Sequence, residues 1–237
     1  MKLFSRSLFS VFFLISTLAS TCRSTITVPT LAPRTSPQLD FAAIRDRAID
    51  TTVRVRSQNR MMASYDGGGY REAIGAGIVI GAGPLVLTAN HHVRDSTGVV
   101  IAFPLRGDAT TREIPMRIVR SSEDRDVALL APREGSTDAV SMLIARKTPS
   151  PGDPIWFYGR TSAMSSGTIL DDQSIVGPRG RLIETDMVSS NGDSGAPCMN
   201  DRGELIGVLI LGTNGGPHTY CVRIDDAFST LGITPKN

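Results

Sequence analysis

The sequence predicts an all-β fold built from two sets of short strands. From residue 51 onward, short apolar and β-branched stretches alternate with turn residues, and many short strands at this spacing indicate a sandwich or barrels. A connector rich in Pro, Ser and Thr, around Pro149–Pro151, separates the two sets. The first set lies near residues 51–57, 73–80, 84–89, 98–103, 112–120 and 126–131, and the second near 154–159, 165–170, 181–187, 197–200, 205–212 and 219–224.

Residues 1–21 have the pattern of a secretory signal peptide. A basic start is followed by the apolar run Leu8–Ala19, which is shorter than the ~20 residues that a membrane-spanning helix needs. The sequence therefore predicts export to the periplasm, cell envelope or exterior. Cys22 directly follows this region and is a lipidation candidate, which makes the segment a possible lipoprotein signal. Plain cleavage near Ala19 or Thr21 is the alternative, because the residues before Cys22 match a lipobox poorly.

The segment 22–40 is rich in Thr, Ser and Pro without an apolar period, which predicts a disordered tether. The folded domain is then expected to cover residues 41–237. Asp40 can cap a short helix that places Phe41, Ile44 and Ile49 on one face, although further linker is an equally good interpretation.

The charge balance argues against a nucleic-acid partner. The formal net charge is +2, and Lys2 and Arg6 are the charged side chains of residues 1–21. Removal of that segment leaves a neutral chain, without the basic surface that nucleic acid requires. Membrane contact is expected only through a lipid at Cys22. The share of hydrophobic residues, 41%, is sufficient for a sizeable core.

A nucleophile loop is one interpretation of residues Thr185–Pro197. Gly192 and Gly195 bracket Ser194, and glycine allows positive φ and close approach of backbone N–H groups to a substrate. If the amides of Gly192 and Ser194 converge, they form an oxyanion hole for attack by the serine. An ordinary polar turn between strands is the alternative.

A nucleophilic serine needs a base, and the chain has three histidines: His91, His92 and His218. The first two follow an apolar strand, which ends in a polar turn. Asp126 is the one acid of its loop that directly precedes the next apolar strand, so it can orient a buried imidazole. Histidine, aspartate and serine thus occur in that chain order, ending at Ser194.

Four separate pieces carry a resemblance to a known family. They are Gly75–Ile80 with Leu87–His91, Asp126–Leu130, Gly152–Ile155 with Tyr158–Gly159, and Thr185–Asp186 followed by Gly-Asp-Ser-Gly-Ala-Pro. In this order they resemble a trypsin-like (chymotrypsin-fold) serine protease, most closely the HtrA/Deg protease domain. The resemblance implies two packed six-stranded antiparallel β-barrels, chymotrypsin-like, at about 51–135 and 150–231, with the active site between them.

The resemblance also implies the roles of the site residues. His91 is the general base, Asp126 orients it, Ser194 is the nucleophile, and the Gly192 and Ser194 amides bind the oxyanion. The family motif places the histidine three residues after a threonine, which selects His91, whereas a slip of one residue selects His92. The expected activity is that of an exported serine endopeptidase that forms an acyl-enzyme with polypeptide substrates.

In the family, the residue six before the serine lies at the base of the pocket for the P1 side chain, the side chain that precedes the scissile bond. Val188 occupies that position here, which favours small or medium apolar P1 residues over basic ones. Ile210, Leu211 and Gly212 are expected to form the pocket wall and the edge that a peptide joins as a strand. His218 either lies near this pocket and favours an acidic or amide-bearing residue, or is a plain turn residue.

The cysteines and Asp193 add further expectations. Cys198 and Cys221 are disulfide candidates, with two free buried thiols as the alternative. No Cys-x-x-Cys or spaced histidine pair occurs, so we expect no metal and no cofactor. Trypsin-like zymogens pair the aspartate before the serine with a new amino terminus that begins Ile-Val-Gly-Gly. Since that sequence is missing, Asp193 is expected to face solvent or brace a loop that assembles without cleavage.

Two other interpretations remain. One is a catalytically silent protease-fold protein that binds polypeptides in the cell envelope. The other is an α/β-hydrolase, which is disfavoured because Ala196 breaks its Gly-x-Ser-x-Gly motif and because His218 would have to be the base. The few residues after Ser194 predict no PDZ domain, and the sequence does not define an oligomeric state.

Overall fold

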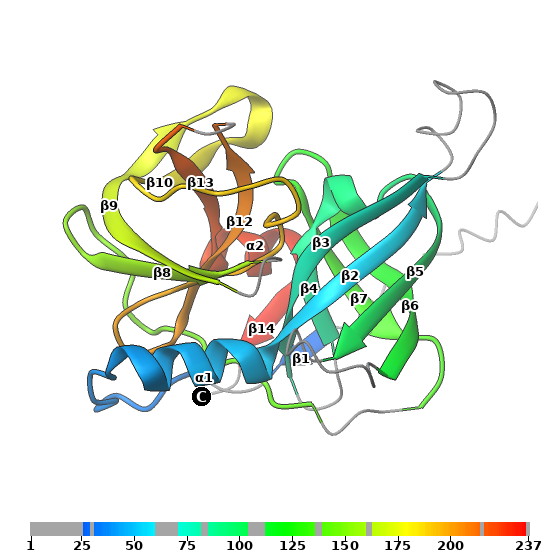
Figure 1. The fold of residues 1–237 in the computed structure, drawn as a ribbon, viewed down its shortest axis with the longest axis horizontal. Coiled ribbons are helices and arrows are strands. Elements are labelled where there is room, and N and C mark those ends of the chain that lie inside the picture. Colours follow the sequence, from blue (N-terminus) through cyan, green and yellow to red (C-terminus); the bar gives the residue numbers. More distant parts are fainter. Residues whose placement is uncertain are drawn as a thin grey trace, which may run out of the picture.

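The fold consists of two closed six-stranded antiparallel barrels that lie side by side (Figure 1), which confirms the predicted fold class. The computed structural model describes residues 26–28, 31–59, 71–81, 85–103, 112–135, 139–159, 163–213 and 216–235. The predicted signal peptide and Cys22 lie outside the described residues. No helix within those ranges is long and apolar enough to cross a membrane.

The two barrels share one strand topology. The first closes in the order β2-β3-β4-β7-β6-β5, and the second in the equivalent order β8-β9-β10-β13-β12-β11. The first contains β2 (Thr52–Asn59), β3 (Arg71–Ile80), β4 (Leu85–Ala89), β5 (Ser96–Phe103), β6 (Arg112–Ser122) and β7 (Val127–Pro132). The second contains β8 (Pro154–Tyr158), β9 (Met164–Ile175), β10 (Arg181–Thr185), β11 (Pro197–Met199), β12 (Leu205–Gly212) and β13 (Thr219–Arg223).

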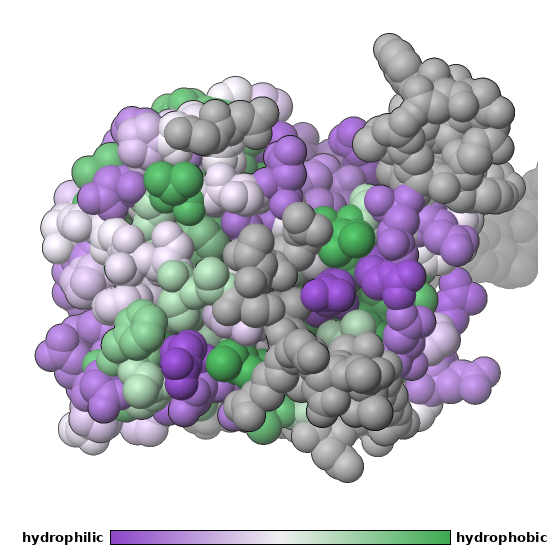
Figure 2. Space-filling view, viewed as in Figure 1, coloured by the Kyte–Doolittle hydropathy of each residue, from purple (hydrophilic) through white to green (hydrophobic). Residues whose placement is uncertain are grey.

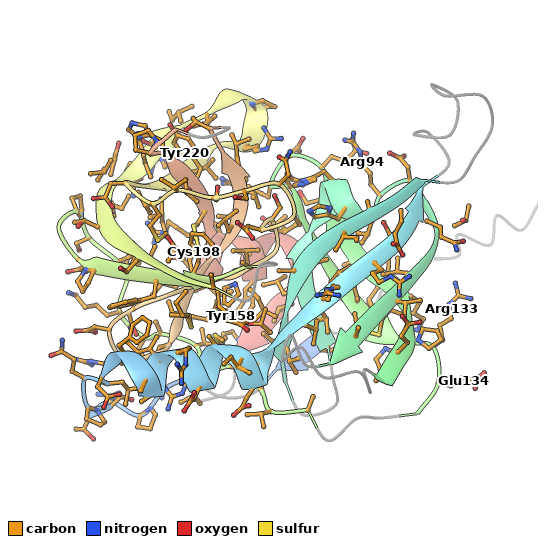
Figure 3. The ribbon with its side chains drawn as sticks, in the orientation of Figure 1. Arg94, Arg133, Glu134, Tyr158, Cys198 and Tyr220 are labelled. Carbon is orange, nitrogen blue, oxygen red and sulfur yellow. A yellow bond between two sulfur atoms is a disulfide. The ribbon has the colours of Figure 1, made fainter. Side chains whose placement is uncertain are left out.

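A continuous apolar core joins the barrels. Leu87 and Leu129 of the first barrel belong to the same buried cluster as Val208 and Ile210 of the second, and Tyr158, labelled in Figure 3, lies in it with 2% of its surface exposed. On the face shown in Figure 2, hydrophobic residues form small separate groups among hydrophilic ones. Two further buried clusters fill the interiors of the individual barrels, so burial of apolar surface stabilises each barrel as well as the contact between them.

Helix α1 (Phe41–Thr51) connects the second barrel to the first. Asp40 is its N-cap, since Oδ1 accepts a hydrogen bond from the Ala43 amide at 2.8 Å. The Phe41 ring lies 5.7 Å from the ring of Trp156 on β8, and Ile44 is buried. In Figure 1 the helix lies below the second barrel and continues directly into β2, which rises across the first barrel.

Helix α2 (Ile224–Leu231) was not predicted. Its buried residues Ile224, Ala227, Phe228 and Leu231 follow helical spacing, and Gly232 ends it with φ 61°. Strand β14 (Ile233–Pro235) follows and pairs in parallel with β1 (Ile26–Val28). Part of the segment expected to be a disordered tether is therefore paired with the end of the domain.

Cys198 on β11 and Cys221 on β13 form a disulfide across β12, with Cα atoms 6.9 Å apart. Both residues are fully buried inside the second barrel, where Figure 3 labels Cys198. Gly207 on β12 makes room for the bridge, because a Cβ there would lie 3.2 Å from Cys221 Cβ and 2.7 Å from the Val222 carbonyl oxygen. The bridge thus joins the two strands that flank β12.

Removal of this disulfide is expected to destabilise the domain by about 3 kcal/mol, because the bridge closes a loop with a sequence separation of 23. The measurement is urea unfolding with and without dithiothreitol. The double variant Cys198→Ala/Cys221→Ala should unfold at lower urea and should not respond to the reductant. A wild-type midpoint that stays constant after thiol titration has shown full reduction would contradict the prediction.

Candidate active site

Strand pairing brings His91 and Asp126 together. β4 and β7 are neighbours, with Ala89 paired to Val127. His91 lies in the short 3-10 helix η2 (Asn90–His92) that directly follows β4, and Asp126 directly precedes β7. Because antiparallel neighbours place the end of one strand beside the start of the other, these two residues meet at one end of the first barrel.

Asp126 holds both the backbone and the ring of His91. Its Oδ1 accepts a hydrogen bond from the His91 amide at 2.8 Å, and its Oδ2 lies 2.7 Å from Nδ1 of the ring. Its carbonyl accepts from the Asn90 amide at 3.0 Å. Asp126 has φ 53° and is the only non-glycine residue with positive φ in the described ranges. Such backbone strain persists only where the surroundings fix it, and it clusters at functional sites.

This contact determines the tautomer of His91. An ionised carboxylate can only accept hydrogen bonds, so Nδ1 carries the proton and Nε2 keeps a lone pair. Asp126 is 4% exposed, whereas the His91 side chain is 33% exposed. Asp126 is therefore buried behind a partly exposed His91 ring, whose Nε2 can accept a proton.

The loop that carries Ser194 is attached to both barrels. The Ala76 amide on β3 donates to the Ser194 carbonyl at 2.9 Å, and the Gly195 amide donates to the Leu209 carbonyl on β12 at 2.7 Å. The hydroxyl of Ser194 donates to the Ile210 carbonyl at 3.4 Å. Within the described residues it makes no hydrogen bond with His91, a contact that often tightens only with bound substrate.

The backbone of this loop offers two unused donors. Gly192 has φ 93°, and the amides of Gly192 and Ser194 donate to no acceptor in the part of the chain that the structure describes. Asp193 is 4% exposed, and its Oδ2 accepts from the Ser190 amide at 2.8 Å. Asp193 therefore braces the loop and does not face solvent. A Cβ at Gly159 would overlap the Asp193 carboxylate, so that glycine makes room for the brace.

The expected pocket residues lie in different surroundings. Val188 is 54% exposed, so it does not form a buried base. Its neighbour Ser189, which the sequence reasoning missed, is 8% exposed and lies 3.1 Å from Thr219 Oγ1. A Cβ at Gly212 would overlap the Ser189 hydroxyl. Ser189 and the end of β12 are thus in contact, which leaves little room between them for a side chain.

The other expected pocket residues lie on β12 and β13. Ile210 is buried, whereas Leu211 and Gly212 are partly exposed at the end of β12. His218 precedes β13, and its Nδ1 lies 2.8 Å from Glu184 Oε1, a close contact whose geometry is not that of a hydrogen bond. His218 therefore lies beside a carboxylate of β10.

His92 is enclosed beneath the site. It is 9% exposed, and its Nε2 has no hydrogen-bond partner within the described residues. The ring packs on Gly75, where a Cβ would lie 2.7 Å from Nε2. Burial and the neighbouring His91 lower the pKa of His92 to about 4, and the Asp126 carboxylate opposes this only in part. His92 is therefore neutral near pH 7, and His91 is the histidine that contacts Asp126.

The buried His92 is expected to make the domain acid-sensitive. Its pKa is lower in the folded chain than the usual 6.5, so the unfolded chain binds more protons below pH 6.5. The contribution of neutral His92 to the free energy of unfolding is fully present above that pH. It is lost as the pH falls toward 4, by about 2 kcal/mol at pH 5. Urea unfolding at pH 7.5 and pH 5 measures this loss. His92→Gln should reduce it by that amount, and an equal loss in wild type and variant would refute the assignment.

No cluster of three or more His, Cys, Asp or Glu side chains suited to a metal occurs among the residues that the structure describes. The site contains an imidazole oriented by a carboxylate, a serine hydroxyl and two backbone amides without an acceptor among the described residues. Those are the components of acyl transfer.

The sequence profile of the trypsin-like peptidase domain matches residues 75–208, more than half of the chain. The chain belongs to the trypsin-like peptidase family. The matched range includes His91, Asp126 and Ser194.

Periplasmic serine endoproteases are among its relatives. A probable periplasmic serine endoprotease DegP-like of Ectopseudomonas mendocina is 30% identical over 160 residues, which are 62% of this chain and 31% of the relative. A DegP-like protein of Pseudomonas putida (strain F1) is 27% identical over 197 residues, 77% of this chain and 39% of the relative. Periplasmic serine endoprotease DegP of Escherichia coli K12 is 26% identical over 170 residues, which are 64% of this chain and 34% of the relative. The chain spans less than two fifths of each relative's length.

Proposed function

We propose that this protein is an exported serine endopeptidase with the triad His91, Asp126 and Ser194. The observation that carries the proposal is the 2.7 Å contact between Asp126 Oδ2 and His91 Nδ1, in a chain whose Ser194 loop is bonded to the same barrel through Ala76. Family membership and relatives named as serine endoproteases support it.

The proposed reaction proceeds through an acyl-enzyme. Ser194 Oγ attacks the peptide carbonyl while His91 Nε2 takes the hydroxyl proton, and the negative oxygen is bound by the amides of Gly192 and Ser194. His91 then protonates the leaving amine as the C–N bond breaks. Water attacks the acyl-enzyme, with His91 again as base, and releases the acid and free Ser194.

The geometry favours substrates with a small P1 side chain. The contact of Ser189 with Gly212 narrows the space beside β12, so alanine should be preferred to valine, and both to glutamate or arginine. The substrate backbone would pair with Ile210–Gly212 as an added strand. A peptide series that varies only P1 tests this, and a preference for arginine would refute it.

Export is supported by two independent features. The relatives are named as periplasmic, and the second barrel contains the buried disulfide Cys198–Cys221, a bond that persists in oxidising compartments. The signal peptide at residues 1–21 and a lipid at Cys22 stay predictions. Mass spectrometry of the mature amino terminus would distinguish a diacylated Cys22 from plain cleavage.

Labelling with a fluorophosphonate probe tests the function most directly. The folded mature chain should label, and Ser194→Ala and His91→Ala should each abolish labelling. Ser190→Ala is the matched control, because this exposed serine lies in the same loop and contacts Asp193 through its backbone amide. Cleavage of casein by the labelled protein then distinguishes a peptidase from another serine hydrolase.

A polypeptide-binding protein without catalysis is the second candidate. It is favoured by one observation: the Ser194 hydroxyl bonds to the Ile210 carbonyl, not to His91. If the folded wild-type chain neither labels nor cleaves casein yet binds unfolded polypeptide, this second candidate replaces the first.

A further inference from the structure

We propose that Arg179 is a positioning residue of the active site, an inference that rests on the proposed function. Arg179 ends the 3-10 turn η3 (Gly177–Arg179) between β9 and β10 of the second barrel. Its Nε lies 3.6 Å from Oδ2 of Asp126, the oxygen that also contacts His91 Nδ1. The second barrel thus supplies a cation to the acid of the first barrel.

The surroundings make this ion pair more effective than a surface pair. The side chain of Asp126 is 5% exposed and that of Arg179 is 30% exposed. The Nε of Arg179 is itself buried and has no hydrogen-bond partner within the described residues. A buried donor without a partner is costly, so Nε gains from any movement that brings it closer to the carboxylate.

A second arginine makes a contact from the first barrel to the η3 turn of the second. Arg125, the neighbour of Asp126, donates from Nη1 to the carbonyl of Arg179 at 2.9 Å and to that of Arg181 at 3.4 Å. Gly180, with φ 73°, makes room for it, because a Cβ there would lie 2.5 Å from Nη1. The loop that contains Asp126 therefore fixes the η3 turn through Arg125, and this turn places the Arg179 side chain beside Asp126.

The consequence for catalysis is orientation. Asp126 has a strained backbone, and its carboxylate must keep one oxygen on the His91 amide and the other on the ring. Arg179 opposes rotation of the carboxylate away from Nδ1, because its guanidinium attracts the oxygen that contacts the ring. Arg179 forms an ion pair with Asp126 and, among the described residues, makes no hydrogen bond with His91 or Ser194. It therefore acts through Asp126 and is not a catalytic group.

Steady-state kinetics of Arg179→Met test the inference. Loss of orientation should lower kcat on the order of 10-fold, with KM changed less than twofold. Arg179→Lys keeps the charge and should recover part of the loss. Arg181→Met is the matched control, because it removes an exposed positive charge at the start of β10, two residues after Arg179, and it should leave kcat within twofold of wild type. Melting temperatures of all variants verify that they fold.

Three results would overturn the inference: an unchanged kcat in Arg179→Met, a raised KM with constant kcat, or an equal loss in Arg181→Met. The rate of fluorophosphonate labelling separates this failure from failure of the proposed function. A wild type that does not label refutes the function itself. A wild type and an Arg179→Met variant that label at equal rates refute only the role of Arg179.

Discussion

Asp126→Asn is expected to lower kcat/KM by about 10⁴-fold while the domain stays folded. An asparagine offers one acceptor oxygen where two donors, the His91 amide and Nδ1, now contact the carboxylate. If the oxygen accepts from the amide, the NH₂ group faces Nδ1, and the ring must carry its proton on Nε2. That nitrogen then cannot accept the proton of Ser194.

The matched control for this prediction is Asp124→Asn. Asp124 is exposed and lies two residues away in the same turn, so its substitution should change kcat/KM by less than twofold. Peptide cleavage and circular dichroism of both variants provide the measurements. Retention of a tenth of the wild-type activity in Asp126→Asn, or an equal loss in both variants, would show that the contact does not determine the tautomer.

The parts of the site that could be predicted from the sequence are those defined by local pattern. The apolar runs predict β4 and β7, with His91 two residues after the first and Asp126 directly before the second. That β4 and β7 pair, although β5 and β6 lie between them in the chain, came from the resemblance to the family and not from the local pattern. The glycines around Ser194 likewise indicated a loop with positive φ, which Gly192 and Gly195 adopt.

The parts that could not be predicted depend on contacts between distant residues. Nothing near Arg179 in the sequence indicates that its turn reaches Asp126. The exposure of Val188 and the burial of Ser189 depend on how the loop packs against Thr219. Helix α2 is the exception, because the spacing of Ile224, Ala227, Phe228 and Leu231 was visible in the sequence.

Gly195→Ala is expected to lower kcat/KM by at least about 100-fold. The Cβ would overlap the Ala76 carbonyl oxygen and lie 2.7 Å from Thr88 Oγ1. Neither group can retreat easily, because Thr88 Oγ1 donates to that same carbonyl at 2.7 Å and both residues belong to paired strands. The Ser194 loop must therefore move away from β3 by about 1 Å, and a displacement of that size costs an enzyme about two orders of magnitude.

Gly152→Ala separates this clash from the cost of positive φ. Gly152 has φ 89°, nearly the 88° of Gly195, but a Cβ there meets no atom within 4 Å. Both variants should lose about 1 kcal/mol of stability through the left-handed backbone, and only Gly195→Ala should lose activity as well. Urea unfolding and peptide cleavage of the pair decide between the two causes. If Gly152→Ala were equally inactive, backbone strain alone would explain the loss, and the close contact between Gly195 and β3 would not be what positions Ser194.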